Sequence, residues 1–99
     1  MKLSYHPLVQ RDVNEILDHY REVSGEALAN RFFDDLQSSL KTLLENPLAF
    51  PFYMGHSQAR RVRLRAFPYL IVYRILPDKV RVNVIKHESR HPRYGMSRN

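Results

Sequence analysis

The sequence predicts an α+β fold, in which a helical hairpin packs on a mostly antiparallel four-stranded sheet. Three observations lead to this prediction. Apolar residues recur at helical spacing in two consecutive segments of the first half, strand patterns fill most of the second half, and a short strand pattern opens the chain. The predicted order is β-α-α-β-β-β, and a length of 99 residues suits one domain with one core. Residues 1–46 would form a strand and the helical hairpin, residues 60–87 a three-stranded antiparallel unit, and residues 88–99 a basic tail.

Residues 2–5 predict the first strand, with Leu3 and Tyr5 on one side. A helix is expected directly afterwards, because Pro7 suits a first helical turn, where its missing amide donor costs nothing. The apolar stripe of this helix consists of Val9, Val13, Ile16, Leu17 and Tyr20. The dipeptide Ser24-Gly25 ends it.

The second helix has the clearest pattern in the chain. Its broad apolar stripe consists of Ala29, Phe32, Phe33, Leu36, Leu40, Leu43 and Leu44. Asn46-Pro47 ends the helix, and we expect the whole stripe, both phenylalanines included, to lie in the core. Because only a few residues separate the two helices, they form a hairpin whose stripes face the same sheet.

Three strands are predicted after an irregular loop. Residues 60–65 alternate between cationic and apolar side chains, whereas residues 69–76 are apolar almost throughout, which is typical of a central strand buried on both faces. Pro77 and Asp78 suit a type I turn into the last strand. The side chains of that strand expected to point inward are Val80, Val82 and Val84.

Charge is distributed unevenly along the chain. Residues 1–49 hold five Lys and Arg against eight Asp and Glu, a net −3, whereas residues 50–99 hold eleven against two, a net +9. Such a concentration favours an anionic partner, either nucleic acid or an acidic protein segment, over a face kept basic only for solubility. Nine of the eleven cations are arginines, which bind phosphates and carboxylates with two hydrogen bonds.

A cationic face is predicted on the sheet. Arg61, Arg63 and Arg65 fall on alternate positions and so share one side of a strand, with Arg74 and Arg81 on the strands beside it. These arginines could line a groove that contacts phosphates or an acidic partner. The alternative is an edge strand that its charges protect from aggregation.

A second cluster closes the last strand and begins the tail. It consists of His87, Arg90, His91 and Tyr94. Histidine moves protons near neutral pH, tyrosine orients or donates, and arginine stabilises charge on a phosphate, so this set could cleave RNA without a metal. The alternative is that these residues bind a partner or simply end the sheet.

The segment His87-Glu88-Ser89-Arg90-His91 matches the zinc-protease pattern His-Glu-x-x-His. That motif works only on a helix, which sets both imidazoles on one face, whereas here it follows a strand and Pro92 disfavours helical geometry. We therefore expect no metal site and no cofactor. The chain has no cysteine, no apolar run of membrane-spanning length and no signal-peptide pattern, so a cytoplasmic protein without membrane contact is expected.

Several segments together resemble one known family. They are the helix end 44–47, the run Arg63 to Arg74 with Phe67-Pro68-Tyr69 and Tyr73-Arg74, and the run Val84 to Tyr94 with His87-x-x-Arg90. In these segments and in its element order the chain resembles the RelE/ParE superfamily of toxins from bacterial type II toxin–antitoxin modules. It is most similar to the ParE-like, plasmid-stabilisation branch.

The resemblance implies a growth inhibitor that a cognate antitoxin holds silent, in a complex that contacts operator DNA only through the antitoxin. ParE-like members poison DNA gyrase by binding, whereas RelE-like members cut messenger RNA on the ribosome. By position, Arg65 matches the strand-two arginine of the nuclease branch, and His87, Arg90 and Tyr94 match its last-strand and tail groups. Nuclease members often carry lysines on strand two, where this chain has arginines only. The resemblance therefore favours the gyrase-binding branch, with the endoribonuclease as the alternative.

Overall fold

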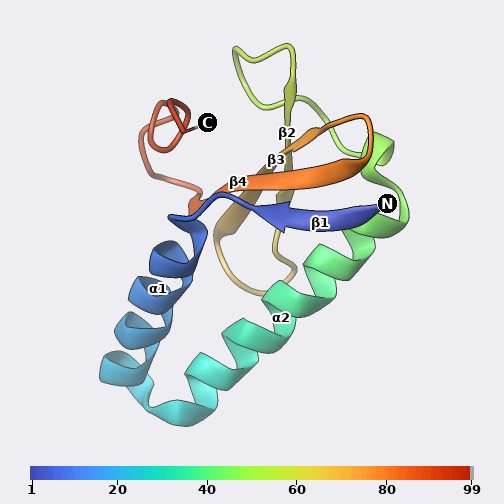
Figure 1. Ribbon diagram of the computed structural model, residues 1–99. Coiled ribbons are helices and arrows are strands. Elements are labelled where there is room, and N and C mark those ends of the chain that lie inside the picture. Colours follow the sequence, from blue (N-terminus) through green and yellow to red (C-terminus); the bar gives the residue numbers. More distant parts are fainter. Residues whose placement is uncertain (99) are drawn as a thin grey trace.

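The computed structural model describes residues 1–98, and it confirms the predicted fold class and element order. The elements are β1 (Lys2–Tyr5), α1 (Val9–Ser24), α2 (Glu26–Glu45), a short 3-10 helix η1 (Pro47–Ala49), β2 (Ala59–Arg63), β3 (Tyr69–Ile75) and β4 (Lys79–His87). The sheet order is β1-β4-β3-β2; β1 runs parallel to β4, and the other neighbours are antiparallel. The two helices form a hairpin below one face of this sheet (Figure 1).

The main core lies between the helices and the sheet. Four aromatic rings meet at its centre, where Phe32 of α2 makes edge-to-face contacts with Phe67 and Tyr69 at centroid distances of 5.5 and 5.4 Å, and Tyr20 of α1 contacts all three. Leucines of α2 extend this core along the sheet. The expectation for Phe33 was wrong, because this side chain lies 41% exposed.

Strand β2 is shorter than predicted. It ends at Arg63, because Asp35 of α2 accepts hydrogen bonds from the backbone amides of Arg65 and Ala66, at 3.2 and 2.8 Å. Arg65 is therefore a loop residue that does not share the strand side of Arg61 and Arg63. Ala66 beside it is also exposed.

A β-bulge in β4 changes which side chains face the helices. Val72 of β3 pairs with Val84, but the next residue, Tyr73, pairs with Val82, so Asn83 has no partner on β3. Val80 and Val82 face the helical core as expected, but after the bulge Ile85 takes that side. Val84 faces the opposite side, contrary to the prediction, and joins a second, smaller apolar cluster there.

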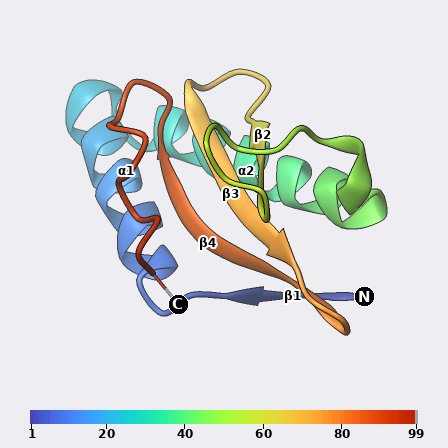
Figure 2. The same cartoon turned by 90° about the horizontal axis from the view of Figure 1, so that it is seen from above.

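The basic tail folds back over the sheet face that the helices leave open. This second cluster consists of Tyr53, Ala59, Leu70, Val72 and Val84, with Tyr94 and Met96 of the tail packed against it. Figure 2 looks onto this face and shows the tail passing in front of α1 and beside β4. Gly95 has φ +77°, and its Cα lies so close to Val84 that a Cβ there would approach the valine side chain to 2.6 Å.

Candidate functional site

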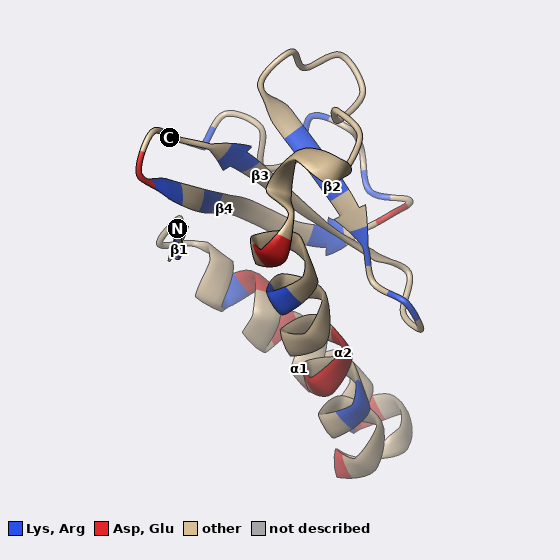
Figure 3. Cartoon of the chain, turned by 90° about the vertical axis from the view of Figure 1, so that its right-hand side faces the viewer, with Lys and Arg blue, Asp and Glu red and all other residues tan. Residues whose placement is uncertain are grey.

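Most cations lie on the sheet and the tail, and most carboxylates lie on the helices (Figure 3). Arg61 and Arg63 project from β2 on the face away from the helices, because Val62 between them packs into the helical core. A groove of about 480 Å³ runs over this face, which we call the basic groove. Its lining residues are Phe52, Tyr53, Met54, Arg61, Arg63, Leu70, Glu88, Arg90 and Pro92.

The arginines predicted to form the cationic face have different partners. Arg63 donates to Glu88 at 3.0 Å, with both side chains more than a third exposed, whereas no carboxylate of residues 1–98 forms a salt bridge with Arg61. Arg74 donates to Gln58 at 2.8 Å, and Arg81 to the hydroxyl of Ser4 at 3.3 Å. Arg74 and Arg81 lie outside the lining of the basic groove.

Three of the four residues predicted for nuclease chemistry meet around one cavity. His87, Arg90 and Tyr94 line a space of about 180 Å³ between α1 and β4, together with Glu15 and His19 of α1. The guanidinium of Arg90 lies 3.8 Å from the ring centroid of Tyr94. Arg65, the fourth residue, does not line this cavity, and neither does His91.

The His87 ring is held by contacts within the protein. Its Nδ1 accepts the backbone amide of Ser89 at 3.0 Å and lies 2.8 Å from the Ser89 hydroxyl, and its ring meets Tyr69 edge to face. Burial, with a further contribution from Tyr20, raises the pKa of the Tyr69 hydroxyl, which therefore stays protonated at neutral pH. The cavity thus holds an oriented histidine beside the Tyr69 phenol, which stays neutral.

Two buried cations, absent from the predicted site residues, fix the tail against the sheet. Lys86 is 3% exposed, and its ammonium donates to the carbonyl oxygens of Pro92 and Tyr94 at 2.9 and 3.0 Å. Burial, and then the nearby Arg90 and Arg98, lower its pKa to about 8. Because Arg90 lies two residues before Pro92 and Tyr94 is itself anchored, Lys86 helps to position both side chains.

The second buried cation, Arg98, forms a bidentate salt bridge with Asp12 of α1, with N–O distances of 2.6 and 2.9 Å. The Arg98 side chain is 6% exposed and that of Asp12 is 2% exposed. The hydrogen bond to this carboxylate, which outweighs the burial of the guanidinium, raises the pKa of Arg98. Asp12 also accepts the amide of Ile85 at 3.1 Å. Asp12 stands at a buried position of α1, but its partner lies 86 positions away, so sequence spacing gave no signal for the pair.

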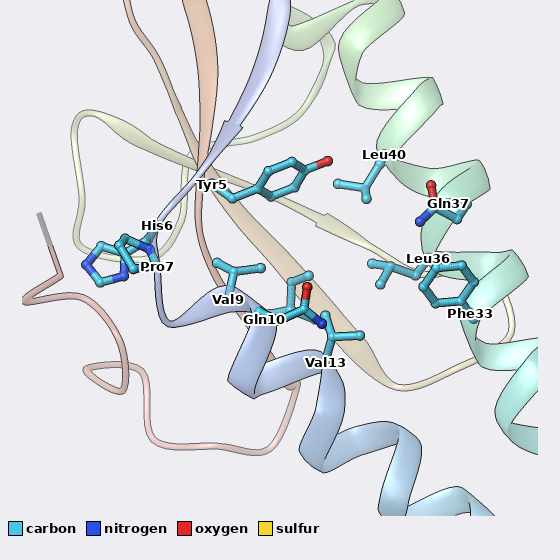
Figure 4. Close-up of a pocket in the computed structure, with 11 residues that line it drawn as sticks. Tyr5, His6, Pro7, Val9, Gln10, Val13, Phe33, Leu36, Gln37 and Leu40 are labelled. Atoms are coloured by element: carbon cyan, nitrogen blue, oxygen red, sulfur yellow. The ribbon is translucent and has the colours of Figure 1, made fainter.

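The sequence pattern did not predict an apolar groove that lies at the helical side of the molecule. This groove, of about 340 Å³, lies between β1, the start of α1 and the middle of α2. Figure 4 shows Tyr5 reaching toward Leu40, and Phe33 and Leu36 of α2 facing Val13 of α1 across the gap. Phe33 widens the apolar stripe of α2 and could have indicated this groove, but helical periodicity alone assigned its side chain to the core.

Among residues 1–98, no three His, Cys, Asp or Glu side chains come together as metal ligands. The His-Glu-x-x-His segment lies at the end of β4 and in a turn, so its two histidines do not share a helix face. In the same part of the chain no helix has the length and apolar character needed to cross a bilayer.

Comparison with known proteins identifies the family. The profile described as "ParE toxin of type II toxin-antitoxin system, parDE" matches residues 3–92, which cover the described helices and strands except for Lys2, the first residue of β1. The chain is thus a member of the RelE/ParE superfamily. More closely, it belongs to the ParE family of toxins from type II toxin–antitoxin systems.

The fold is also that of a solved structure described as the chromosomal ParDE TA system from P. aeruginosa. The TM-score is 0.79 at 19% sequence identity, over 88% of this chain and 95% of that one. No curated protein sequence matches the chain.

Proposed function

We propose that this protein inhibits growth in the cytoplasm by binding a protein target, DNA gyrase, without nuclease chemistry. One observation carries the proposal: Arg65, needed to complete the predicted nuclease set, is a loop residue tied to α2 through its amide, outside the cavity of His87, Arg90 and Tyr94. The ring of His87 is engaged by Ser89, and Arg90 is stacked on Tyr94. Family membership supports the same mechanism.

Ribosome-dependent cleavage of messenger RNA is the second candidate. It is favoured by the shared cavity of His87, Arg90 and Tyr94, which combines a proton-transfer group with a cation. The two candidates predict different responses to the double variant His87→Ala, Tyr94→Phe. Gyrase binding predicts undiminished growth arrest, with inhibition of gyrase supercoiling by the purified variant. If the variant loses toxicity while circular dichroism shows a native fold, and wild type produces cut transcripts, the gyrase mechanism is rejected.

We further propose that the cognate antitoxin inserts an amphipathic segment into the apolar groove between β1, α1 and α2. The groove exposes Tyr5 and Phe33, which are 47% and 41% accessible, and adjoins β1, an edge strand of the sheet. In the Phe33→Asp variant a charge enters the groove without disturbing the core. We expect this variant to remain toxic but to escape neutralisation by the antitoxin encoded beside it. Retained neutralisation would place the antitoxin elsewhere.

A further inference from the structure

The basic groove lies on the opposite face of the sheet from the apolar groove, and it combines cations with exposed apolar side chains. Arg61, Arg63 and Arg90 supply three guanidinium groups. Phe52 and Met54 beside them are 51% and 71% exposed. A surface that only repels aggregation does not need apolar side chains among its charges. The mixture fits a ligand that brings both carboxylates and apolar groups.

The groove already holds one carboxylate of its own. The Arg63 Nε donates to Glu88 at 3.0 Å to one oxygen and 3.4 Å to the other. Because both side chains are partly solvated, this salt bridge stabilises the fold little and can be exchanged for another one. Glu88 therefore occupies, in the free protein, a position that a ligand carboxylate can take.

Nucleic acid fits this groove less well than a peptide does. Binding of single strands relies on bases stacking on aromatic faces. Around the groove each aromatic ring already carries a cation: Arg60 lies 4.1 Å from the ring centroid of Phe52, Lys86 lies 4.6 Å from that of Tyr53, and Arg90 covers Tyr94.

We propose that the basic groove is a second binding site, which takes an acidic amphipathic polypeptide segment of a partner. Carboxylates of the segment bind Arg61 and Arg63, displacing Glu88 from Arg63, and its apolar side chains cover the exposed Phe52 and Met54. Glu88 acts as an internal competitor that lowers the affinity for weakly acidic segments. The inference rests on the proposal that the protein acts by binding proteins, but it does not depend on gyrase being the target.

Direct binding to the full-length protein tests this site. The probe is a short fluorescein-labelled peptide in which Glu alternates with Leu and Phe, and binding is followed by fluorescence anisotropy at low and high salt. We expect Arg61→Ala and Arg63→Ala each to weaken binding about tenfold, as for the loss of one charge-assisted contact. Glu88→Gln should tighten binding by up to about fivefold, since it removes the competitor. Circular dichroism verifies the fold of each variant.

Arg11→Ala is the control, because Arg11 is an exposed arginine on α1 outside the basic groove, and its removal should leave binding unchanged. Tighter binding of oligo-uridine RNA than of the peptide, lost in the same arginine variants, would overturn the proposal. So would peptide binding that is insensitive to Arg61 and Arg63, or a Glu88→Gln variant with unaltered affinity. Peptide binding as expected together with unaffected gyrase supercoiling would leave this site standing and reject gyrase as the target.

Discussion

The two faces of the sheet are covered by different means. On one face, helices α1 and α2 bury apolar side chains at helical spacing, and Phe32 and Leu43 are fully buried there. The other face has only a small apolar cluster, and it is covered by a loop and a tail held by Lys86 and by Arg98. The cover on the first face is stabilised by burial of apolar side chains, which is non-directional. The cover on the second face is stabilised by buried polar groups, which need their partners to be present.

This difference separates the stability of the fold from the placement of the functional side chains. Loss of an apolar contact at the helical face weakens the whole cooperative unit. Loss of a polar contact at the other face can release the tail alone, because tail segments open at a lower free energy than core elements do. Since Glu88, Arg90 and Tyr94 belong to the tail segment, its release would change both the basic groove and the His87 cavity.

The largest expected effect is at the helical face. Phe32→Ala removes a ring that contacts three other aromatic rings and should lower the free energy of unfolding by about 4 kcal/mol. Urea unfolding followed by circular dichroism measures this loss. Phe33→Ala is the matched control on the same helix, and its 41% exposed ring should cost less than about 1 kcal/mol. Equal losses for the two variants would contradict the assignment of these rings to core and surface.

A somewhat smaller loss is expected at the tail-covered face. Asp12→Ala leaves the Arg98 guanidinium buried without a counter-charge and the amide of Ile85 without its acceptor, at a cost of about 3 kcal/mol. The exposed pair of Arg11 and Glu15, 3.9 Å apart, gives the control, because Arg11→Ala should cost less than about 0.5 kcal/mol.

Hydrogen exchange separates local from global effects of Asp12→Ala. We expect faster exchange for amides of residues 94–98 than for those of β3, since the tail loses its anchor first. Uniformly accelerated exchange across the sheet would show that the tail and the core unfold as one unit. The comparison between the two faces would then fail.

The helical face was predictable from sequence, because the apolar spacing that defines it involves residues close to one another in the chain. Periodicity located both helices and the central strand, Pro77 and Asp78 located the connection into β4, and the family resemblance was confirmed. The errors came from contacts between distant residues. Asp35 ends β2 by capturing two amides of the following loop, and the bulge at Asn83 turns Val84 to the other face. Neither the hydrogen bonds of Asp35 nor the bulge can be recognised from the residue pattern of the strand that it affects.

The candidate site was predictable in part for the same reason. Alternation placed Arg61 and Arg63 on one face, and proximity in sequence grouped His87, Arg90 and Tyr94. No pattern could show that Glu88 pairs with Arg63, 25 positions away. The buried lysine was also hidden, because Lys86 lies just before the basic tail and nothing in the sequence distinguishes it from the exposed cations there.

The smallest expected effect concerns Lys86 and its dependence on pH. Its pKa is about 8 in the folded protein against an ordinary value of 10.5. Between these values the unfolded chain binds a proton that the folded chain has released, so the free energy of unfolding should rise with pH from about 8 upward. The carbonyl oxygens that hold the ammonium oppose its deprotonation, so we expect a gain of about 1–2 kcal/mol between pH 7 and 9.5.

Urea unfolding of wild type and Lys86→Met at several pH values measures this gain, and the methionine variant should lose the pH dependence while keeping an apolar stem in place. Measurements stop below pH 10, because burial raises the pKa of Tyr53 and Tyr73. Above that pH the unfolded chain releases phenolic protons that the folded chain retains, so the free energy of unfolding would fall with pH instead of rising. A rise of equal size in Lys86→Met would assign the pH dependence to other groups. The hydrogen bonds of Lys86 to the carbonyl oxygens of Pro92 and Tyr94 would then fully offset the burial of its ammonium, and Lys86 would hold the tail at every pH of the series.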